Sequence, residues 1–353
     1  KMKTLRNAVI AIFAGLILMI SCKKSDIALP KSEANIDSIA SKYYEGYLKM
    51  YPLEATMQGD SRYNDLLSNN ISSEFISKEI EFYTDTQKKL KSIDYDDLSD
   101  EQKTVYDVLD YTLKDKIERY AYHPELLPFS QFEGLPLDFP LLGSAEGNQP
   151  FKTTKDYDNW LKRIDAFVIW MNTAEKNFRE GMKQNVVLPK KLVVKMIPQM
   201  HSEEIITEDF DKNIFYGPIK KMPKNFSAKD KEKYKILYQE AISSKIIPAY
   251  QKMGDFLEKE YLPKARNTDG INALPNGKNI YEYYAKSWTT TNKTPEEINK
   301  IGLQQVAMLR AEMEKVKTQL GFKGSLEEFL TSLKTDKKAM PYKTPEEVIA
   351  AFN

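Results

Sequence analysis

The amino-acid sequence predicts a mainly α-helical protein, a large multi-helix body with long irregular loops. Apolar residues recur three and four positions apart through most of the chain, which is the spacing that lines one face of a helix. Several of these stretches begin with a side chain that can accept hydrogen bonds from the free N–H groups of a first helical turn. A short apolar run such as Leu192 to Ile197 remains open, because its periodicity fits a strand or a piece of helix equally well.

Residues that can cap a helix indicate where the helices begin along the chain. Ser99 and Gln102 have the spacing of a capping box, and Thr154 is the expected N-cap of the next clear helix. The apolar residues of these two helices, which we expect to be buried, are Val105, Leu109 and Leu113, and then Trp160, Ile164, Phe167, Val168 and Met171. Between them, residues 123–150 are rich in Pro and Gly and read as an irregular loop.

Thr294-Pro295-Glu296-Glu297 is the clearest helix start, since it combines an N-cap Thr, a Pro at the first helical position and a Glu that can bond back to the cap. Gly321 is expected to end this helix. Its apolar stripe is Ile298, Ile301, Val306, Leu309, Met313 and Val316. Ser325 opens a further helix with Phe329 and Leu333 expected to face inward.

The N-terminus has the pattern of a lipoprotein signal peptide. Lys3 and Arg6 precede the apolar run from Ala8 to Ile20, which is shorter than the roughly 20 residues of a membrane-spanning helix. Met19-Ile20-Ser21-Cys22 fits a lipobox, whose Cys is lipidated and becomes the mature N-terminus. We therefore expect a signal peptide over residues 1–21, a lipid-anchored polar stalk over 22–34 and a helical domain over 35–353.

Cys22 is the only cysteine, so no intramolecular disulfide can form. The alternative, a buried Cys closing a core helix, is disfavoured by the polar residues that follow from Lys23 onward. The expected localisation is an exported lipoprotein held in a membrane by the lipid on Cys22, in the outer membrane of a Gram-negative bacterium. Lys1 before Met2, and a new helix start at Thr344 close to Asn353, suggest a partial translation of a longer gene.

Several functional classes lack support in the sequence. The 52 Lys and Arg balance 51 Asp and Glu, and no phosphate-binding Gly-rich loop is present, so nucleic acid is not an expected partner. The two histidines, His123 and His201, lie in no metal-ligand spacing, and His201-Ser202-Glu203-Glu204 reads as a surface polar cluster. Gly59-Asp60-Ser61 reads as a turn that ends a helix, because no base accompanies the Ser. Asp94-Tyr95-Asp96-Asp97 reads as a solvated turn, because it lacks the Gly and Glu of a calcium loop.

The segment from Tyr281 to Lys315 resembles the DUF885 family, through Tyr281-Glu282-Tyr283-Tyr284, Thr289-Thr290-Thr291 and the Thr294 to Leu303 block. The resemblance runs from about Ile36 to Phe352. It includes further blocks in the same order: Tyr51-Pro52-Leu53-Glu54-Ala55-Thr56 with Gly59 and Tyr63, Tyr157 to Arg163, Arg179-Glu180-Gly181 with Pro189, Ile247-Pro248-Ala249-Tyr250 and Leu274-Pro275-Asn276-Gly277.

The resemblance implies a helical, gluzincin-like zinc metallopeptidase acting on peptides, often a lipoprotein in Bacteroidetes. The metal helix of such proteins, of the His-Glu-x-x-x-x-His-His type, lies later in the chain, so this fragment would stop before it. It would have no catalytic residue, metal ligand or cofactor of its own, while zinc is expected for the intact protein. Tyr283 and Tyr284 are the candidate substrate-binding residues, with helix packing as the alternative. Asn299 departs from the His that family members commonly carry after Glu-Glu-Ile.

An alternative function is glycan binding. Helical lipoproteins of the SusD type also begin with a signal, Ser-Cys and a polar stalk, and they bind glycans without catalysis. That resemblance would rest on the lipobox and composition alone, whereas the Tyr281 to Lys315 block supports the peptidase.

The lipobox makes a direct prediction. Replacing Cys22 with Ala should abolish lipid attachment, because the thiol is the only site at which the acyl chains can be joined. Labelling with a palmitate analogue in a bacterial host measures this, and equal label on the wild type and the variant would contradict the lipobox.

Overall fold

The computed structural model describes residues 35–338 and 341–352. The predicted signal peptide, Cys22 and the polar stalk up to residue 34 lie outside the described residues. Within this part of the chain the regular structure is helical, with one isolated β-bridge between Pro189 and Arg266, so the predicted fold class is confirmed. No helix among the described residues is long and apolar enough to cross a membrane. The chain divides into two compact units at Asp269 and Gly270.

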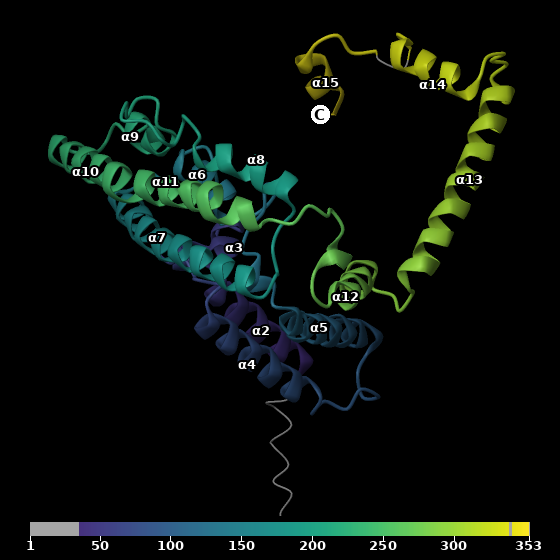
Figure 1. The fold of residues 1–353 in the computed structure, drawn as a ribbon, viewed down its shortest axis with the longest axis horizontal. Helices are drawn as coiled ribbons and strands as arrows, with labels where there is room; N and C mark the ends of the chain where they lie inside the picture. The colour runs from purple at the N-terminus through teal and green to yellow at the C-terminus, as the bar shows by residue number, and fades with distance from the viewer. Residues whose placement is uncertain (1–34, 339–340, 353) are drawn as a thin grey trace, which may run out of the picture. The chain divides into compact units, whose positions relative to one another are not determined.

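The first unit begins with a small helical bundle (Figure 1). Its core joins three helices through Ile36, Ile39, Tyr83, Leu90, Leu109 and Leu113. The elements are α2 (Ile36–Met50), α3 (Pro52–Met57), the 3-10 helix η1 (Ser61–Tyr63), α4 (Ser73–Leu90) and α5 (Asp100–Arg119).

The larger part of the first unit is built on α7 (Thr154–Lys183), which contacts a second long rod. Figure 1 shows this rod beside α7. It consists of α10 (Ala228–Ala241), the π-helix η5 (Ile242–Ile246), α11 (Ile247–Phe256) and the π-helix η6 (Leu257–Tyr261). The shorter elements of this part are the 3-10 helices η2 (Tyr120–Tyr122), η3 (Pro124–Leu126), η4 (Ile214–Tyr216) and η7 (Leu262–Lys264), and the helices α6 (Leu135–Gly143), α8 (Lys190–Met200) and α9 (Gly217–Lys220).

Most predicted helix starts are confirmed. Ser99, Thr294 and Ser325 all form complete capping boxes. The predicted cap at Thr154 is wrong by one residue: Thr153 has the extended backbone of a cap, and it exchanges hydrogen bonds with Asp156. The stretch from Leu192 to Ile197, which fits either a strand or a helix by its sequence, lies in α8 and is helical.

Residues 123–150, predicted to be irregular, contain α6 as well as loops. This helix escapes prediction because Pro136 and Pro140 both lie in it. Pro136 is tolerated in the first turn, where the N–H that it lacks would have no helical partner. Pro140 removes an interior hydrogen bond and is unusual in so short a helix.

Aromatic residues make up much of the main core. Phe139 stacks on Phe167 with ring centroids 4.0 Å apart and on Trp160 at 4.6 Å. Gly143 sits beside this stack, and a Cβ there would come within 2.5 Å of Trp160 and Phe215. The high Tyr and Phe content therefore serves helix packing in this core.

Arg163, on α7, is fully buried and joins α7 to residues about a hundred positions earlier. Its Nε donates to the Leu66 carbonyl at 2.9 Å, and Nη2 donates to Thr56 Oγ1 at 2.7 Å and the Tyr63 carbonyl at 3.2 Å. Nη1 donates to the Gln149 side-chain oxygen. Burial lowers the pKa of Arg163 to about 10, so the side chain is charged at neutral pH.

Glu79, on α4, is a buried carboxylate surrounded by tyrosines. It accepts hydrogen bonds from the hydroxyls of Tyr51, Tyr83 and Tyr120. These donors come from the end of α2, from α4 and from the end of α5, so one carboxylate links the three helices of the bundle. A buried charge is tolerated when several hydrogen bonds replace its water.

The second unit contains the 3-10 helix η8 (Ile271–Ala273), α12 (Gly277–Thr289), α13 (Pro295–Gln319), α14 (Leu326–Thr335) and α15 (Pro345–Phe352). Gly321 follows α13 with φ of 72°, as predicted for its end. No residue of α13 is buried. Its apolar side chains are exposed, including Ile301, Val306, Leu309, Met313 and Val316. In α14, Phe329 is buried as predicted. The prediction that Leu333 faces inward is wrong, since Leu333 is exposed and the buried residues of the helix are Leu326 and Phe329 in its first half.

Replacement of Arg163 tests its structural role. Arg163→Ala would leave several buried carbonyls without donors, so we expect the free energy of unfolding to fall by about 3 kcal/mol or more. Arg163→Lys should lose less, since it keeps the charge but fewer donors. Urea unfolding measures both, with Lys162→Ala as control because Lys162 is exposed and pairs with Asp65 at 3.0 Å. Equal losses for Arg163→Ala and Lys162→Ala would contradict the role.

The tyrosines around Glu79 predict that the stability of the protein falls at alkaline pH. Burial, first, and then the Glu79 carboxylate raise the pKa of Tyr83 and Tyr120, and burial together with Tyr47 raises the pKa of Tyr43 to about 12. In the unfolded chain a tyrosine ionises near pH 10, so the stability from these groups is complete below pH 10 and is lost as pH rises above it. We expect a late phase of tyrosine ionisation that coincides with loss of helical circular dichroism. Ionisation of every tyrosine near pH 10 in a fully helical protein would contradict it.

Candidate functional site

The two tyrosines singled out by the sequence lie on α12 in the second unit. Tyr283 is buried and Tyr284 is partly exposed, with their ring centroids 5.2 Å apart. Tyr283 therefore serves packing, and Tyr284 is the one of the pair that solvent reaches. A role for either in substrate binding stays a prediction.

Two motifs have the structural roles that the sequence predicted. Gly59 has φ of 82° at the turn that follows α3, and Asp60 caps η1 by accepting from the Arg62 N–H at 3.0 Å. Asp94 to Asp97 form an exposed turn between α4 and α5. Neither motif presents an activated nucleophile or a set of converging ligands.

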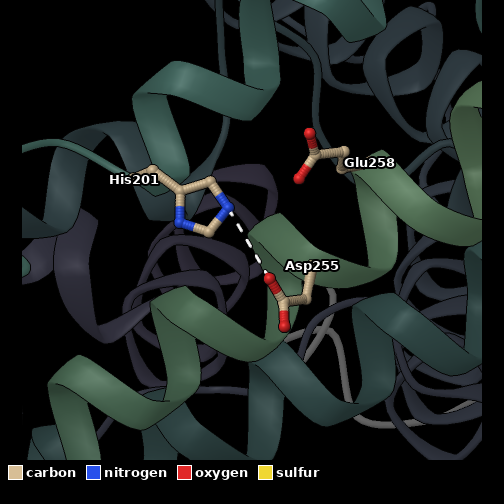
Figure 2. Close-up of side chains that lie close together, drawn as sticks. All are labelled: His201, Asp255 and Glu258. Atoms are coloured by element: carbon tan, nitrogen blue, oxygen red, sulfur yellow. Dashed lines mark ion pairs between the residues drawn. The ribbon is translucent and has the colours of Figure 1, made fainter.

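His201 lies next to two carboxylates that are more than fifty positions away in sequence. It is the residue that follows α8, while Asp255 lies on α11 and Glu258 on η6. One nitrogen of His201 and one oxygen from each carboxylate all lie within 4.8 Å of one another, and Figure 2 shows the three side chains facing a common space. His201 Nε2 is 3.9 Å from Asp255 Oδ1. Among the described residues, this is the one group of three His, Cys, Asp or Glu side chains that meets this distance.

A lysine forms an ion pair with one of these carboxylates. Lys259 Nζ lies 2.9 Å from Asp255 Oδ2, on the side away from the oxygen that faces His201. The hydrogen bond from Lys259 is the largest cause of a lowered pKa for Asp255, and the charge of His201 adds to it. Asp255 is therefore ionised at neutral pH and available to a cation.

Gly254 leaves space for the His201 ring against α11. A Cβ at residue 254 would lie 2.4 Å from Nε2 and 2.6 Å from Cε1 of the ring, so any side chain there would displace it. The ring lies against the backbone of α11, directly beside Asp255. Only glycine allows this approach.

The sequence does not predict this group, because its two carboxylates lie far from His201 in the chain. Glu203 and Glu204, the acidic residues close to His201 in sequence, are exposed and do not belong to the group. The contacts of α8 with α11 and η6 bring the other two residues in, and no spacing motif records such contacts. His123 is separate: its Nδ1 lies 2.9 Å from Glu125.

A small cavity of about 170 Å³ is lined by residues of α7, η5 and α11. Its charged lining residues are paired: Glu175 contacts Lys252 at 2.8 Å and Arg179 at 3.0 Å, and Lys245 pairs with Asp165. The cavity lining is Val168, Met171, Asn172, Glu175, Ser244, Lys245, Pro248, Ala249, Lys252 and Met253. Because these charged side chains pair with one another, the cavity offers a small ligand mainly apolar side chains.

Comparison with known proteins gives a family and a fold. The model of the family described as "Bacterial protein of unknown function (DUF885)" matches residues 52–353. A crystal structure described as that of "the putative lipoprotein from Colwellia psychrerythraea" is similar, with a TM-score of 0.68 and 19% identity. The similarity covers 86% of this chain and 54% of that chain, so this chain spans about half the length of that protein. At this identity the likeness shows the fold alone. No curated protein matches the chain.

Proposed function

We propose, because the chain belongs to the DUF885 family, that it forms the N-terminal helical part of a membrane-anchored zinc metallopeptidase that acts on peptides. In this proposal the zinc ligands and the general base come from a further part of the family fold. The chain described here supplies the scaffold and part of the substrate-binding wall. The lipid on Cys22 would hold the protein in the outer membrane.

The observation that carries the proposal is the exposed apolar face of α13. A soluble helix normally turns its apolar stripe toward a core, and a contiguous exposed stripe marks a surface that another element covers. In α13 the stripe runs from Ile301 to Val316, and no residue of the helix is buried. Most of this helix, from Pro295 to Lys315, lies in one of the segments through which the sequence resembles the family. We infer that the further part of the fold packs against it.

The chemistry of zinc peptidases supports placing the active centre in that further part. A catalytic zinc commonly has three protein ligands, such as two His and one Glu, and an open position for water, which a carboxylate then deprotonates. His201 with Asp255 and Glu258 offers one imidazole, and Lys259 already pairs with one of the carboxylates. This group falls short of a peptidase centre.

Tyr284 is the substrate contact we propose on this chain. It is partly exposed on α12, and its ring packs beside the buried Tyr283. A tyrosine held in this way offers an apolar ring and a hydroxyl to a peptide.

A comparison of two lengths tests the function. The complete gene product should hold about one zinc per molecule after dialysis and should cleave peptides, whereas this chain should do neither, because it lacks the ligand set. Both proteins should carry His201→Ala, so that zinc at that residue does not enter the result. Zinc content and cleavage of a mixed peptide library are the measurements.

Two outcomes would contradict the proposal. Stoichiometric zinc with peptide cleavage in this chain would show that the centre lies within it. A complete product that holds no zinc, cleaves no peptide and retains glycans on an array would favour the SusD-type alternative instead.

A further inference from the structure

We propose that His201, Asp255 and Glu258 form a binding site for one divalent transition-metal cation in the first unit. The site is independent of the proposed catalytic zinc, because all three residues lie before residue 269 and none is asked to take part in peptide hydrolysis. Its expected effect is structural: a bound cation would fasten the end of α8 to the α11–η6 rod.

The geometry fits a cation after small side-chain movements. Metal–ligand distances of about 2.0–2.2 Å place the ligand atoms of a tetrahedral ion roughly 3.4 Å apart. The three candidate atoms lie within 4.8 Å of one another, and His201 Nε2 is 3.9 Å from Asp255 Oδ1. Asp255 and Glu258 are both exposed, so rotation about their side-chain bonds can bring their oxygens to this separation without moving a helix.

The backbone prepares the site. Gly254 leaves room for the His201 ring against α11, so the imidazole is already seated when the cation arrives. Asp255 follows Gly254 directly, and Glu258 lies three residues later, the spacing that places two side chains on the same side of a helix. Glu258 itself lies in the π-helix η6, which begins at Leu257 and is of a type often found at functional sites.

The ligand set selects the class of cation. An imidazole with two carboxylates suits Zn²⁺, Co²⁺ or Mn²⁺, whereas Ca²⁺ and Mg²⁺ prefer oxygen ligands alone. Since His201 and Asp255 keep side-chain exposures of 33% and 52%, water can complete the coordination. Lys259 lowers the affinity, because its ammonium group competes with the cation for Asp255.

Titration of the full chain in mild detergent with Zn²⁺ and Co²⁺ tests the site. We expect His201→Ala, Asp255→Asn and Glu258→Gln each to weaken binding about tenfold or more, since each removes one of three ligands. His123→Ala should change nothing. Lys259→Gln should tighten binding about two- to fivefold, the size of an exposed ion pair, while the charge-matched Lys191→Gln, whose lysine pairs with Asp269, should not.

A second measurement needs no substitution. Diethylpyrocarbonate modifies free imidazoles, and the chain has only His123 and His201, so peptide mass spectrometry reads each one separately. Zn²⁺ should slow modification of His201 and leave His123 unchanged. Equal protection of both histidines, unchanged Zn²⁺ affinity in His201→Ala, or tighter binding of Ca²⁺ than of Zn²⁺ and Co²⁺ would overturn the proposal.

Discussion

The buried guanidinium of Arg163 is the constraint on which the architecture of the first unit depends. A charge taken out of water must be compensated, and here backbone carbonyls, the Thr56 hydroxyl and the Gln149 side chain do so. Four of these acceptors, from Pro52, Thr56, Tyr63 and Leu66, belong to residues 52–66, so Arg163 ties α3 and η1 to α7. The chain that follows continues along the same helix, where Trp170 donates to Asn70 at 2.9 Å and Asn177 to the Ile71 carbonyl at 2.8 Å.

The hydrogen bonds of Arg163 also join two blocks of sequence that lie far apart in the chain. The blocks around Tyr51 to Tyr63 and from Tyr157 to Arg163 lie about a hundred residues apart, and both belong to the family resemblance. Arg163 donates to the first block from the end of the second. Glu79 has the corresponding role in the N-terminal bundle, where three tyrosine hydroxyls converge on one carboxylate. The positions of helices in this unit thus rest on a few buried polar groups as well as on aromatic packing.

The sequence predicts local structure well and long-range contacts poorly. The caps at Ser99, Thr294 and Ser325 are local interactions within four residues, and all three are confirmed. The helix α6 was missed because its prolines satisfy a local rule for loops, while its environment tolerates them. The group at His201 could not be predicted from spacing, because its ligands meet only through the packing of α8 on α11 and η6. Of the predicted site residues, Tyr283 and Tyr284 are neighbours on one helix, which their positions in the sequence already implied.

The exposed stripe of α13 connects the fold to the proposed function, since the further part of the protein that we propose would pack against it. Hydrogen exchange across residues 301–316 tests this most directly, with the amides of α7 as the internal reference. Covering a helix slows the local opening through which its amides exchange. We expect the amides of α13 to exchange at least about tenfold more slowly in the complete gene product than in this chain, and those of α7 to exchange at the same rate in both. Equal exchange of α13 in both proteins would contradict it.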